Sequence, residues 1–352
     1  MTVTDPTTGG RAERPARAAR AARPKPKTWS LLGEVTRRPS VYEATAAKFL
    51  YHYRREPAPF EMSPNAPINE WYLTNREGSP FTVADWEGFR DPAKLTYSDY
   101  VMVQHDRETY LDGLIDHHEA TGSVQTLDPQ WVEALTRVLV PWRFPLHVLQ
   151  MTSLYVAQMA PSAFIVNCAN FQAGDEMRRI QRLAYVTRLL ANAHGEQIAA
   201  TATARDPWQN EAAWQPLREA CERMLGVYDW GEAFTALNLA VKPAVDAVVN
   251  DQLTALAIAH DDEFLALLLA EFDRDAARSR AWTAALVQYA IGQDPAMADV
   301  LRSWLAVHAL RADAAVAGLA ELFAGAPQPM AAAQVIEAAG QARARLLAAC
   351  DL

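Results

Sequence analysis

Residues 174–185 read "GDEMRRIQRLAY" and lie in the middle of a longer stretch, 167–195, whose apolar residues recur at helical spacing. The stretch ends at Gly195, a residue type that commonly terminates a helix. Its centre carries two carboxylates, Asp175 and Glu176, where a buried helix is expected. The first question is therefore whether Glu176 holds a metal.

Helix-start signals appear along the chain from about residue 95. Thr96 or Ser98 is expected to cap the first long helix. Asp128, followed by Pro129 at a first helical position, predicts the start of the next. Pro141 is expected to kink or split that second helix.

The remainder of the chain predicts more helices and no strands. No segment alternates apolar and polar residues over any length, as a half-buried strand would. Helices of 20–30 residues that are apolar on more than one side suit a central bundle. We therefore predict an all-α fold. Further helices are expected over roughly 215–225, 229–250, 252–272, 274–291, 295–308 and 311–324.

The N-terminal quarter has a different composition. Residues 1–28 are rich in Arg, Lys and Pro and are expected to form a disordered basic tail. Residues 29–98 combine many prolines with large aromatic residues, which predicts an extended arm whose rings dock into grooves of this chain or of another. We expect the arm to dock on a partner. The helical domain is then expected to span 99–352. The expected interface residues are Trp71, Tyr72 and Trp86.

Composition excludes several classes of protein. The net charge of −9 argues against a nucleic-acid-binding protein. No run of about 18 apolar residues is free of charge, so no membrane-spanning helix is expected. The 3 cysteines are far apart in the sequence, which is typical of reduced, buried thiols in a cytoplasmic protein.

The sequence lacks the pattern that holds a pair of iron atoms in a helical bundle. Such bundles use two Glu-x-x-His pairs and one further Glu from each of two other helices. Glu-x-x-His occurs nowhere in this chain, and Arg179 stands three residues after Glu176. Between Glu133 and Asp175 there is no Asp or Glu at all. Because arginine is a permanent cation without a lone pair to donate, we expect no metal in this chain.

A second stretch repeats part of the first. "DEMRR" at 175–179 and "DAARS" at 275–279 both contain Asp-x-x-Arg, one hundred residues apart. The structural interpretation is an ion pair between positions i and i+3 on each of two helices.

Several long blocks in order carry a family resemblance. They include "WYLTNREGSPF" at 71–81, "LQMTSLYVAQMAPSAFIVNCA" at 149–169 and "YDWGEAFTALNLAVKP" at 228–243. In these blocks the chain resembles the hydroxylase beta subunit of soluble di-iron multicomponent monooxygenases, in the toluene, isoprene and alkene monooxygenase group. The similarity runs from "KTWSLLGEVTRRPSVYE" at 27–43 to "RSRAWTAALVQYA" at 278–290.

The resemblance implies a ferritin-like bundle that has lost its iron. In this family the alpha subunit carries iron on two Asp-Glu-x-Arg-His motifs, and the beta subunit is its iron-free paralogue. Arg179 stands at the first histidine position, and Ala276 and Ser279 stand at the second Glu and His. Lys242 falls where the third-helix Glu is expected and would supply a fixed positive charge, paired with Glu176. The vestigial ligand positions are thus Glu176, Arg179, Lys242, Ala276 and Ser279.

The function that the resemblance implies is that of a non-catalytic structural subunit. Its complex would use O₂ and electrons from NADH to oxidise a hydrocarbon, by alkene epoxidation or aromatic hydroxylation. The implied partners are an alpha subunit that holds the di-iron centre, a regulatory protein and a reductase with its ferredoxin, with a gamma subunit left open. Two alternatives remain: an active di-iron bundle in its own right, or an unrelated helical scaffold protein.

Overall fold

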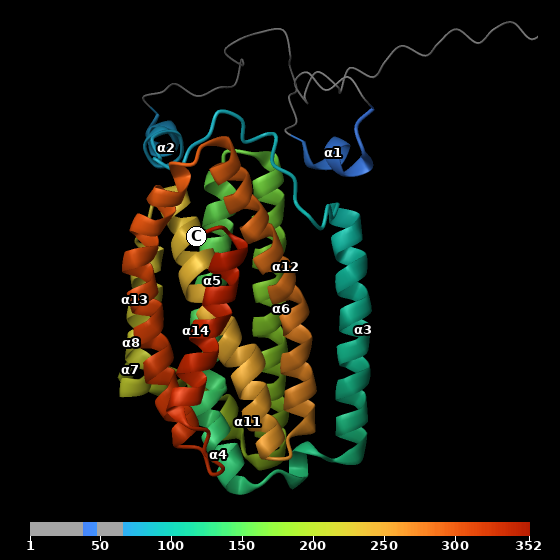
Figure 1. Cartoon of the computed structure of the whole chain (residues 1–352). Coiled ribbons are helices and arrows are strands. Elements are labelled where there is room, and N and C mark those ends of the chain that lie inside the picture. The colour runs from blue at the N-terminus through green and yellow to red at the C-terminus, as the bar shows by residue number, and fades with distance from the viewer. Residues whose placement is uncertain (1–37, 48–65) are drawn as a thin grey trace, which may run out of the picture.

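The computed structural model describes residues 38–47 and 66–352, and every regular element in these ranges is a helix (Figure 1). The predicted all-α bundle is confirmed. The basic tail 1–28 and much of the proposed arm lie outside the described residues.

Four long helical segments form the centre of the bundle. They are α5 (Arg143–Met159), α6 (Ala163–His194), α12 (Glu263–Gln293) and the run from Trp230 to Ala259. Helix α6 packs against both α5 and α12, and the run from Trp230 also contacts both α5 and α12. Every central helix therefore presents one face to the interior that lies between all four.

Local sequence sets the ends of these helices. The Ser162 hydroxyl accepts a hydrogen bond from the Phe164 N–H at the start of α6, and Gly195 ends that helix with φ of 128°. Asp128 caps α4 (Pro129–Val138), with Pro129 at its first position as predicted. Thr96 caps α3 (Tyr97–Thr121) and forms a reciprocal capping box with the side chain of Asp99.

The run from Trp230 to Ala259 alternates between α- and π-helical turns. It consists of α9 (Trp230–Phe234), the π segment η7 (Thr235–Val241), α10 (Lys242–Asp246), a second π segment η8 (Ala247–Gln252) and α11 (Leu253–Ala259). The break expected near residue 251 is wrong, because the helix continues to Ala259. It stops instead where Asp261 adopts a left-handed φ of 56°.

The outer helices cover the side of the bundle formed by α5 and the run from Trp230. They are α7 (Thr201–Asn210), α8 (Gln215–Leu225), α13 (Met297–Ala324) and α14 (Ala332–Ala349). The helix ranges expected from the sequence also imply breaks near residues 273 and 309. Both predictions are wrong, since α12 and α13 each continue through these positions. Charged side chains at these points, such as Arg274, lie on the exposed side of a continuous helix.

Short elements connect these helices. They are α1 (Val41–Ala46), α2 (Pro67–Tyr72), the π segment η2 (Leu73–Glu77) and the 3₁₀ turns η3 (Val124–Thr126), η4 (Val140–Trp142), η5 (Glu196–Ala199) and η6 (Ala212–Trp214). Pro141 lies in η4, where the predicted split between α4 and α5 occurs.

The proposed boundary between arm and helical domain is too far along the chain. Phe81 and Phe89 are fully buried in the same core as the helices. Phe81 fits against α9 because Gly231 has no side chain there; a Cβ would lie 2.5 Å from the Cβ of Phe81. At least residues 81–89 therefore belong to the helical domain rather than to an arm.

Helix α3 stands to one side of the bundle (Figure 1). Its C-terminal half buries Leu111, Ile115 and His118. Its N-terminal half instead exposes apolar side chains to the outside, among them Tyr97 and Met102. This half contacts α6 and α12 through ion pairs and hydrogen bonds, and the ring of Tyr100 stacks on Phe171 of α6.

Candidate functional site: a buried ion cluster

Two rows of polar side chains face each other across the centre of the bundle. One row lies on the run from Trp230 at every fourth residue, and the other lies on α6. All are at most 5 % exposed. The rows are Asn238, Lys242, Asp246 and Asn250, opposite Gln172, Glu176 and Arg179.

The π segments account for the four-residue spacing. In an α-helix each residue turns through about 100°, so a step of four residues overshoots a full turn by about 40°. A π-helix closes i→i+5 hydrogen bonds and therefore contains more residues per turn. Segments η7 and η8 flank α10. Their smaller rotation per residue offsets the overshoot and keeps the row facing α6.

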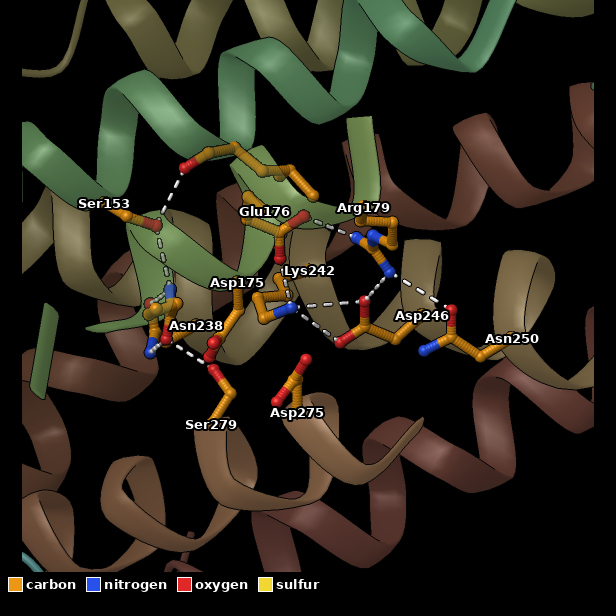
Figure 2. A network of polar contacts seen from close by, with 12 residues as sticks. Ser153, Asp175, Glu176, Arg179, Asn238, Lys242, Asp246, Asn250, Asp275 and Ser279 are labelled. Carbon is orange, nitrogen blue, oxygen red and sulfur yellow. Dashed lines mark hydrogen bonds and ion pairs between the residues drawn. The ribbon is translucent and has the colours of Figure 1, made fainter. Parts of the chain in front are cut away.

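Four charged residues form a closed cluster in these rows (Figure 2). Lys242 Nζ lies 2.5 Å from Glu176 Oε1 and 3.0 Å from Asp246 Oδ2. Arg179 reaches the same two carboxylates, at 2.7 Å from Glu176 Oε2 and 2.8 Å from Asp246 Oδ1. Arg179 also donates to Asn250 Oδ1 at 3.2 Å. Two cations are thus bridged by the same two carboxylates, and their formal charges cancel.

The pKa values of Lys242 and Asp246 are shifted in the directions that favour their charged forms, despite their burial. Burial alone would lower the pKa of Lys242, but the adjacent Asp246 and Glu176 carboxylates outweigh it and raise that pKa above its usual value. Burial would likewise raise the pKa of Asp246, and the charges of Lys242 and Arg179 outweigh it and lower that pKa. The pairing predicted between Lys242 and Glu176 is therefore present as an ion pair.

A second, uncharged network lies one turn away. Gln172 Oε1 accepts hydrogen bonds from the Ser279 hydroxyl and, at 3.1 Å, from Trp282 Nε1. Gln172 Nε2 donates to Ser153 Oγ at 3.0 Å, and Asn238 Nδ2 donates to Gln172 Oε1 at 3.1 Å. Ser279, which was expected at the second histidine position, thus belongs to a neutral network. Ala276, which was expected at the second glutamate position, is buried and apolar.

The repeated Asp-x-x-Arg stretches pair across helices rather than only along them. Asp175 on α6 forms an ion pair with Arg278 on α12, and Arg178 Nη1 on α6 lies 2.9 Å from Asp275 Oδ2 on α12. The expected i, i+3 pair exists between Asp275 and Arg278, at 3.3 Å. Gln104 Nε2 on α3 joins both carboxylates, at 2.8 Å from Asp175 and 3.1 Å from Asp275.

Sequence reasoning missed Asp246, Asn250, Gln172 and Asn238. Each stands four residues from another buried polar residue of the two rows, in a largely apolar stretch. That spacing is the signal that could have identified them, because helical residues four apart lie on one face.

The expected interface residues lie in different environments. Trp71 is 37 % exposed, packs edge-on against Tyr228 and donates its indole N–H to the Tyr155 hydroxyl at 3.1 Å. Tyr72 is half-buried and accepts a hydrogen bond from Gln158. Trp86 is only 9 % exposed. Its ring is T-shaped against Trp230, so it packs in this chain's own core.

The donor set at the centre does not fit a di-iron site. Arg179 and Lys242 place two buried cations against the Glu176 and Asp246 carboxylates, and a buried cation repels a metal ion that would use the same oxygens. Within residues 38–47 and 66–352, His, Cys, Asp and Glu side chains do not gather in threes that could ligate a metal. No helix of these ranges combines the length and apolar character needed to cross a membrane.

Comparisons with known proteins agree on one family. The profile of the Methane/Phenol/Alkene Hydroxylase family matches residues 71–294. The hydroxylase component subunit beta of the toluene-4-monooxygenase system of Ectopseudomonas mendocina is 34 % identical over 321 residues, covering 91 % of this chain and 97 % of that protein. An oxygenase component of a phenol 2-monooxygenase of Pseudomonas sp. strain CF600 is 25 % identical, covering 69 % of this chain and 72 % of that protein.

Solved structures agree with the sequence relatives. A chain of toluene 4-monooxygenase hydroxylase, solved with toluene in its resting active site, superposes with a TM-score of 0.78 at 34 % identity, covering 85 % of this chain and 98 % of that chain. Phenol hydroxylase from Pseudomonas sp. OX1 gives a TM-score of 0.76 at 20 % identity over 96 % of this chain and 97 % of that chain, which indicates the same fold. The chain described here belongs to the methane/phenol/alkene hydroxylase family and is a homologue of its hydroxylase beta subunits.

Proposed function

We propose that this chain is the non-catalytic beta subunit of the hydroxylase component of an NADH-dependent, cytoplasmic di-iron monooxygenase. The observation that carries the proposal is the central ion cluster, in which Arg179 and Lys242 pair with buried carboxylates. The family resemblance implies that a catalytic paralogue would place metal ligands at these two positions. The 34 % identity to a hydroxylase beta subunit, over 91 % of this chain, supports the same role.

The chemistry of the cluster suits a structural role. Lys242 and Arg179 are cationic donors that pair with the Glu176 and Asp246 carboxylates, so they offer no redox couple and no lone pair for a metal. Their ion pairs join α6 to α10 at the level where metal would join the helices of a catalytic subunit. The oxidation step itself would take place in an alpha subunit that holds the di-iron centre.

The substrates for which the relatives are named suggest a broad class of substrate. The relatives are named for toluene, phenol and propane, so we propose a hydrocarbon or simple aromatic substrate. Alkene epoxidation and aromatic hydroxylation remain the two candidate reactions. A regulatory protein, a ferredoxin and a reductase complete the proposed assembly.

Co-purification tests the proposal. The chain, tagged at its C-terminus, is co-expressed with a candidate alpha subunit that bears two Asp-Glu-x-Arg-His motifs. We expect a stable complex with iron in proportion to the alpha subunit, and Glu176→Ala in this chain is expected to leave that iron content unchanged. Stoichiometric iron in this chain when it is expressed alone and folded would contradict a non-catalytic role. Failure to retain any iron-containing partner would instead favour the unrelated scaffold.

A further inference from the structure

The side of α3 that faces away from the bundle is acidic. Successive residues on this side are separated by three, four, seven and three positions, a spacing that keeps them on one face of a helix. All of them are exposed, whereas the buried residues of α3 lie on the opposite side. We call this set the outer row, and it consists of Asp99, Met102, Asp106, Gly113 and Asp116.

The negative charge of the outer row is not balanced by the described part of this chain. The single Lys or Arg of α3 is Arg107, whose side chain is only 16 % exposed and pairs with Asp275 on α12. Among the described residues, neither Asp106 nor Asp116 forms an ion pair with a Lys or Arg. The row therefore favours a basic occupant. A second copy of this chain would place one acidic row against another and would be repelled.

Gly113 is a second unusual feature of the outer row. A Cβ added at this position would meet nothing within 4 Å among the described residues, so packing within this part of the chain does not require a glycine. Glycine in the middle of a helix is less favourable than alanine. The close approach of another backbone is a physical reason to have a glycine on an exposed helix face.

The sequence contains a basic segment with a matching spacing. Arginine recurs at every third position from 11 to 23, and Lys25 and Lys27 follow. The single acid between residues 11 and 27 is Glu13. Three residues of extended chain span at most about 10 Å, and the seven residues from Asp99 to Asp106 rise by about 10 Å along a helix. Successive arginines can therefore reach successive positions along the outer row.

The described part of the chain begins beside the N-terminal end of α3 (Figure 1). In α1, the Tyr42 hydroxyl accepts a hydrogen bond from the Asp91 N–H at 3.3 Å, and Glu43 pairs with Arg90 at 3.4 Å. Both partners belong to the segment that leads into α3. The ten residues 28–37 can span at most about 35 Å, and a helix of 25 residues such as α3 is about 37 Å long. The basic segment can therefore reach most of the helix.

We propose that residues 11–27 of this chain dock along the outer row of α3 and cover it. In this arrangement the arginine side chains pair with the aspartates, and the alanines between them pass over Gly113. Charge complementarity, the matched spacing and the length of the intervening chain support this occupant. The inference goes beyond the proposed function and does not depend on it.

The test measures how fast proteinase K cleaves residues 11–27 in the full-length chain, in whatever assembly the wild-type chain forms. This protease does not require a charged residue, so it serves for every variant, and mass spectrometry assigns the fragments. A synthetic peptide of residues 1–37 gives the rate without docking. We expect cleavage in the chain to be about tenfold slower than in the peptide, because several exposed ion pairs act together. In about 1 M NaCl the two rates should become equal.

Two variants with the same change of charge identify the docking surface. D106N/D116N neutralises two acids of the outer row and is expected to raise the cleavage rate to near that of the peptide. E133Q/D299N neutralises two exposed acids on α4 and α13 and is expected to leave the protection unchanged. All four acids are exposed, so both variants are expected to fold, which circular dichroism checks.

A charge swap distinguishes direct pairing from a general effect of charge. R14E/R17E/R20E alone and D106R/D116R alone are each expected to abolish the protection. The chain that carries both sets should regain it, because each new pair again has opposite charges. If a variant of α3 does not fold, R14E/R17E/R20E still tests the proposal, since it leaves the helical domain unchanged.

Three results would overturn the proposal. The first is cleavage of the wild-type segment at the rate of the free peptide, and the second is equal protection in D106N/D116N and wild type. The third is protection that appears only when an alpha subunit is bound, which would place the segment on that subunit. None of these results depends on the iron content of a complex, so this inference and the proposed function can fail separately.

Discussion

Lys242 and Glu176 are sixty-six residues apart in the sequence and 2.5 Å apart in the structure, both almost completely buried. Each belongs to a different central helix, and each has a second partner of opposite charge in the same cluster. The pair therefore links two helices of the core through charge rather than through apolar packing. Removing one member leaves the remaining charges unbalanced in a low-dielectric interior.

The first prediction concerns stability. Glu176→Ala leaves Lys242 and Arg179 with one carboxylate between them, and breaking such a buried pair is expected to cost about 3–5 kcal/mol of unfolding free energy. Urea unfolding curves, recorded by circular dichroism, measure this loss of unfolding free energy. Glu222→Ala is the matched control, because Glu222 pairs with Arg218 on the surface and is 62 % exposed. That variant is expected to change stability by less than about 1 kcal/mol. Equal losses in the two variants would contradict the importance of the cluster.

The second prediction concerns pH. Burial, together with the neighbouring Asp275 carboxylate, raises the pKa of Asp175 to about 7, although Arg278 opposes the shift. Because the folded-state pKa lies above the unfolded value of about 3.9, ionising Asp175 disfavours the folded state. The stability that the wild-type protein gains from a protonated Asp175 is fully present below about pH 4 and is lost as the pH rises through about 7. Relative to wild type, Asp175→Asn should therefore become progressively more stable between these limits.

Paired denaturation series at several pH values measure this difference, in the same buffers for both proteins. Asparagine keeps an acceptor for the Tyr100 hydroxyl and for Gln104, whereas the ion pair with Arg278 is lost at every pH. The change of the stability difference with pH, and not its absolute size, is therefore the readout. A stability difference that does not change between pH 4 and 8 would show that Asp175 remains ionised throughout.

The third prediction concerns α3. Its N-terminal half is attached through polar side chains: Arg178 Nε lies 2.5 Å from Glu108, and Arg107 forms an ion pair with Asp275. Its apolar residues Val101 and Met102 point outward. Salt screens partly exposed ion pairs but strengthens apolar burial. Raising NaCl from 0.1 to about 1 M should therefore speed amide exchange in the first half of α3.

The second half of the same helix is an internal control. It buries Leu111 and Ile115 against the core, so its exchange should not increase with salt. Hydrogen exchange read by mass spectrometry on peptides from 100–110 and 111–121 distinguishes the halves. Equal acceleration of both peptides would mean that α3 opens as one unit, and no acceleration of either would mean that the ion pairs do not set its attachment.

The sequence predicts long-range contacts where chemistry restricts the partners. Lys242 could be assigned to Glu176 because a buried cation requires a carboxylate, and the family blocks fix the spacing between the helices. Asp246 and Asn250 were missed because their surroundings, "KPAVDAVVN", read as ordinary apolar helix. The two π segments are not visible in composition, although they decide which side chains of this helix face α6.

The sequence is less informative where apolar residues could pack on either of two surfaces. The aromatic side chains of a Pro-rich segment need a groove in which to pack, but composition does not show whether that groove belongs to this chain or to a partner. Phe81 and Trp86 pack on Trp230 of the same chain, whereas the ring of Trp71 remains partly exposed. Helix breaks were misplaced for a related reason. A charged residue such as Asp273 is typical both of a loop and of the outer side of a long helix.

The last prediction separates two tryptophans that were expected to act alike. Trp86→Ala removes a ring buried between Phe81 and Trp230, so it should destabilise this chain itself by about 3–5 kcal/mol. Trp71→Ala removes a ring that is 37 % exposed and packs on Tyr228 at the surface. We expect a smaller loss of stability and, if Trp71 anchors the proposed alpha subunit, a larger loss of assembly.

Both variants are measured in the co-expressed complex, by the yield of alpha subunit recovered and by the distribution of products. Trp71→Ala should reduce the recovered alpha subunit and the amount of product in proportion. It should leave the ratio of products unchanged, because the proposed substrate pocket lies in the other subunit. Trp86→Ala should reduce the soluble amount of this chain before assembly. A Trp71→Ala complex that assembles fully but shifts the ratio of products would show that this chain shapes the pocket, and the proposed division of labour between the subunits would then be wrong.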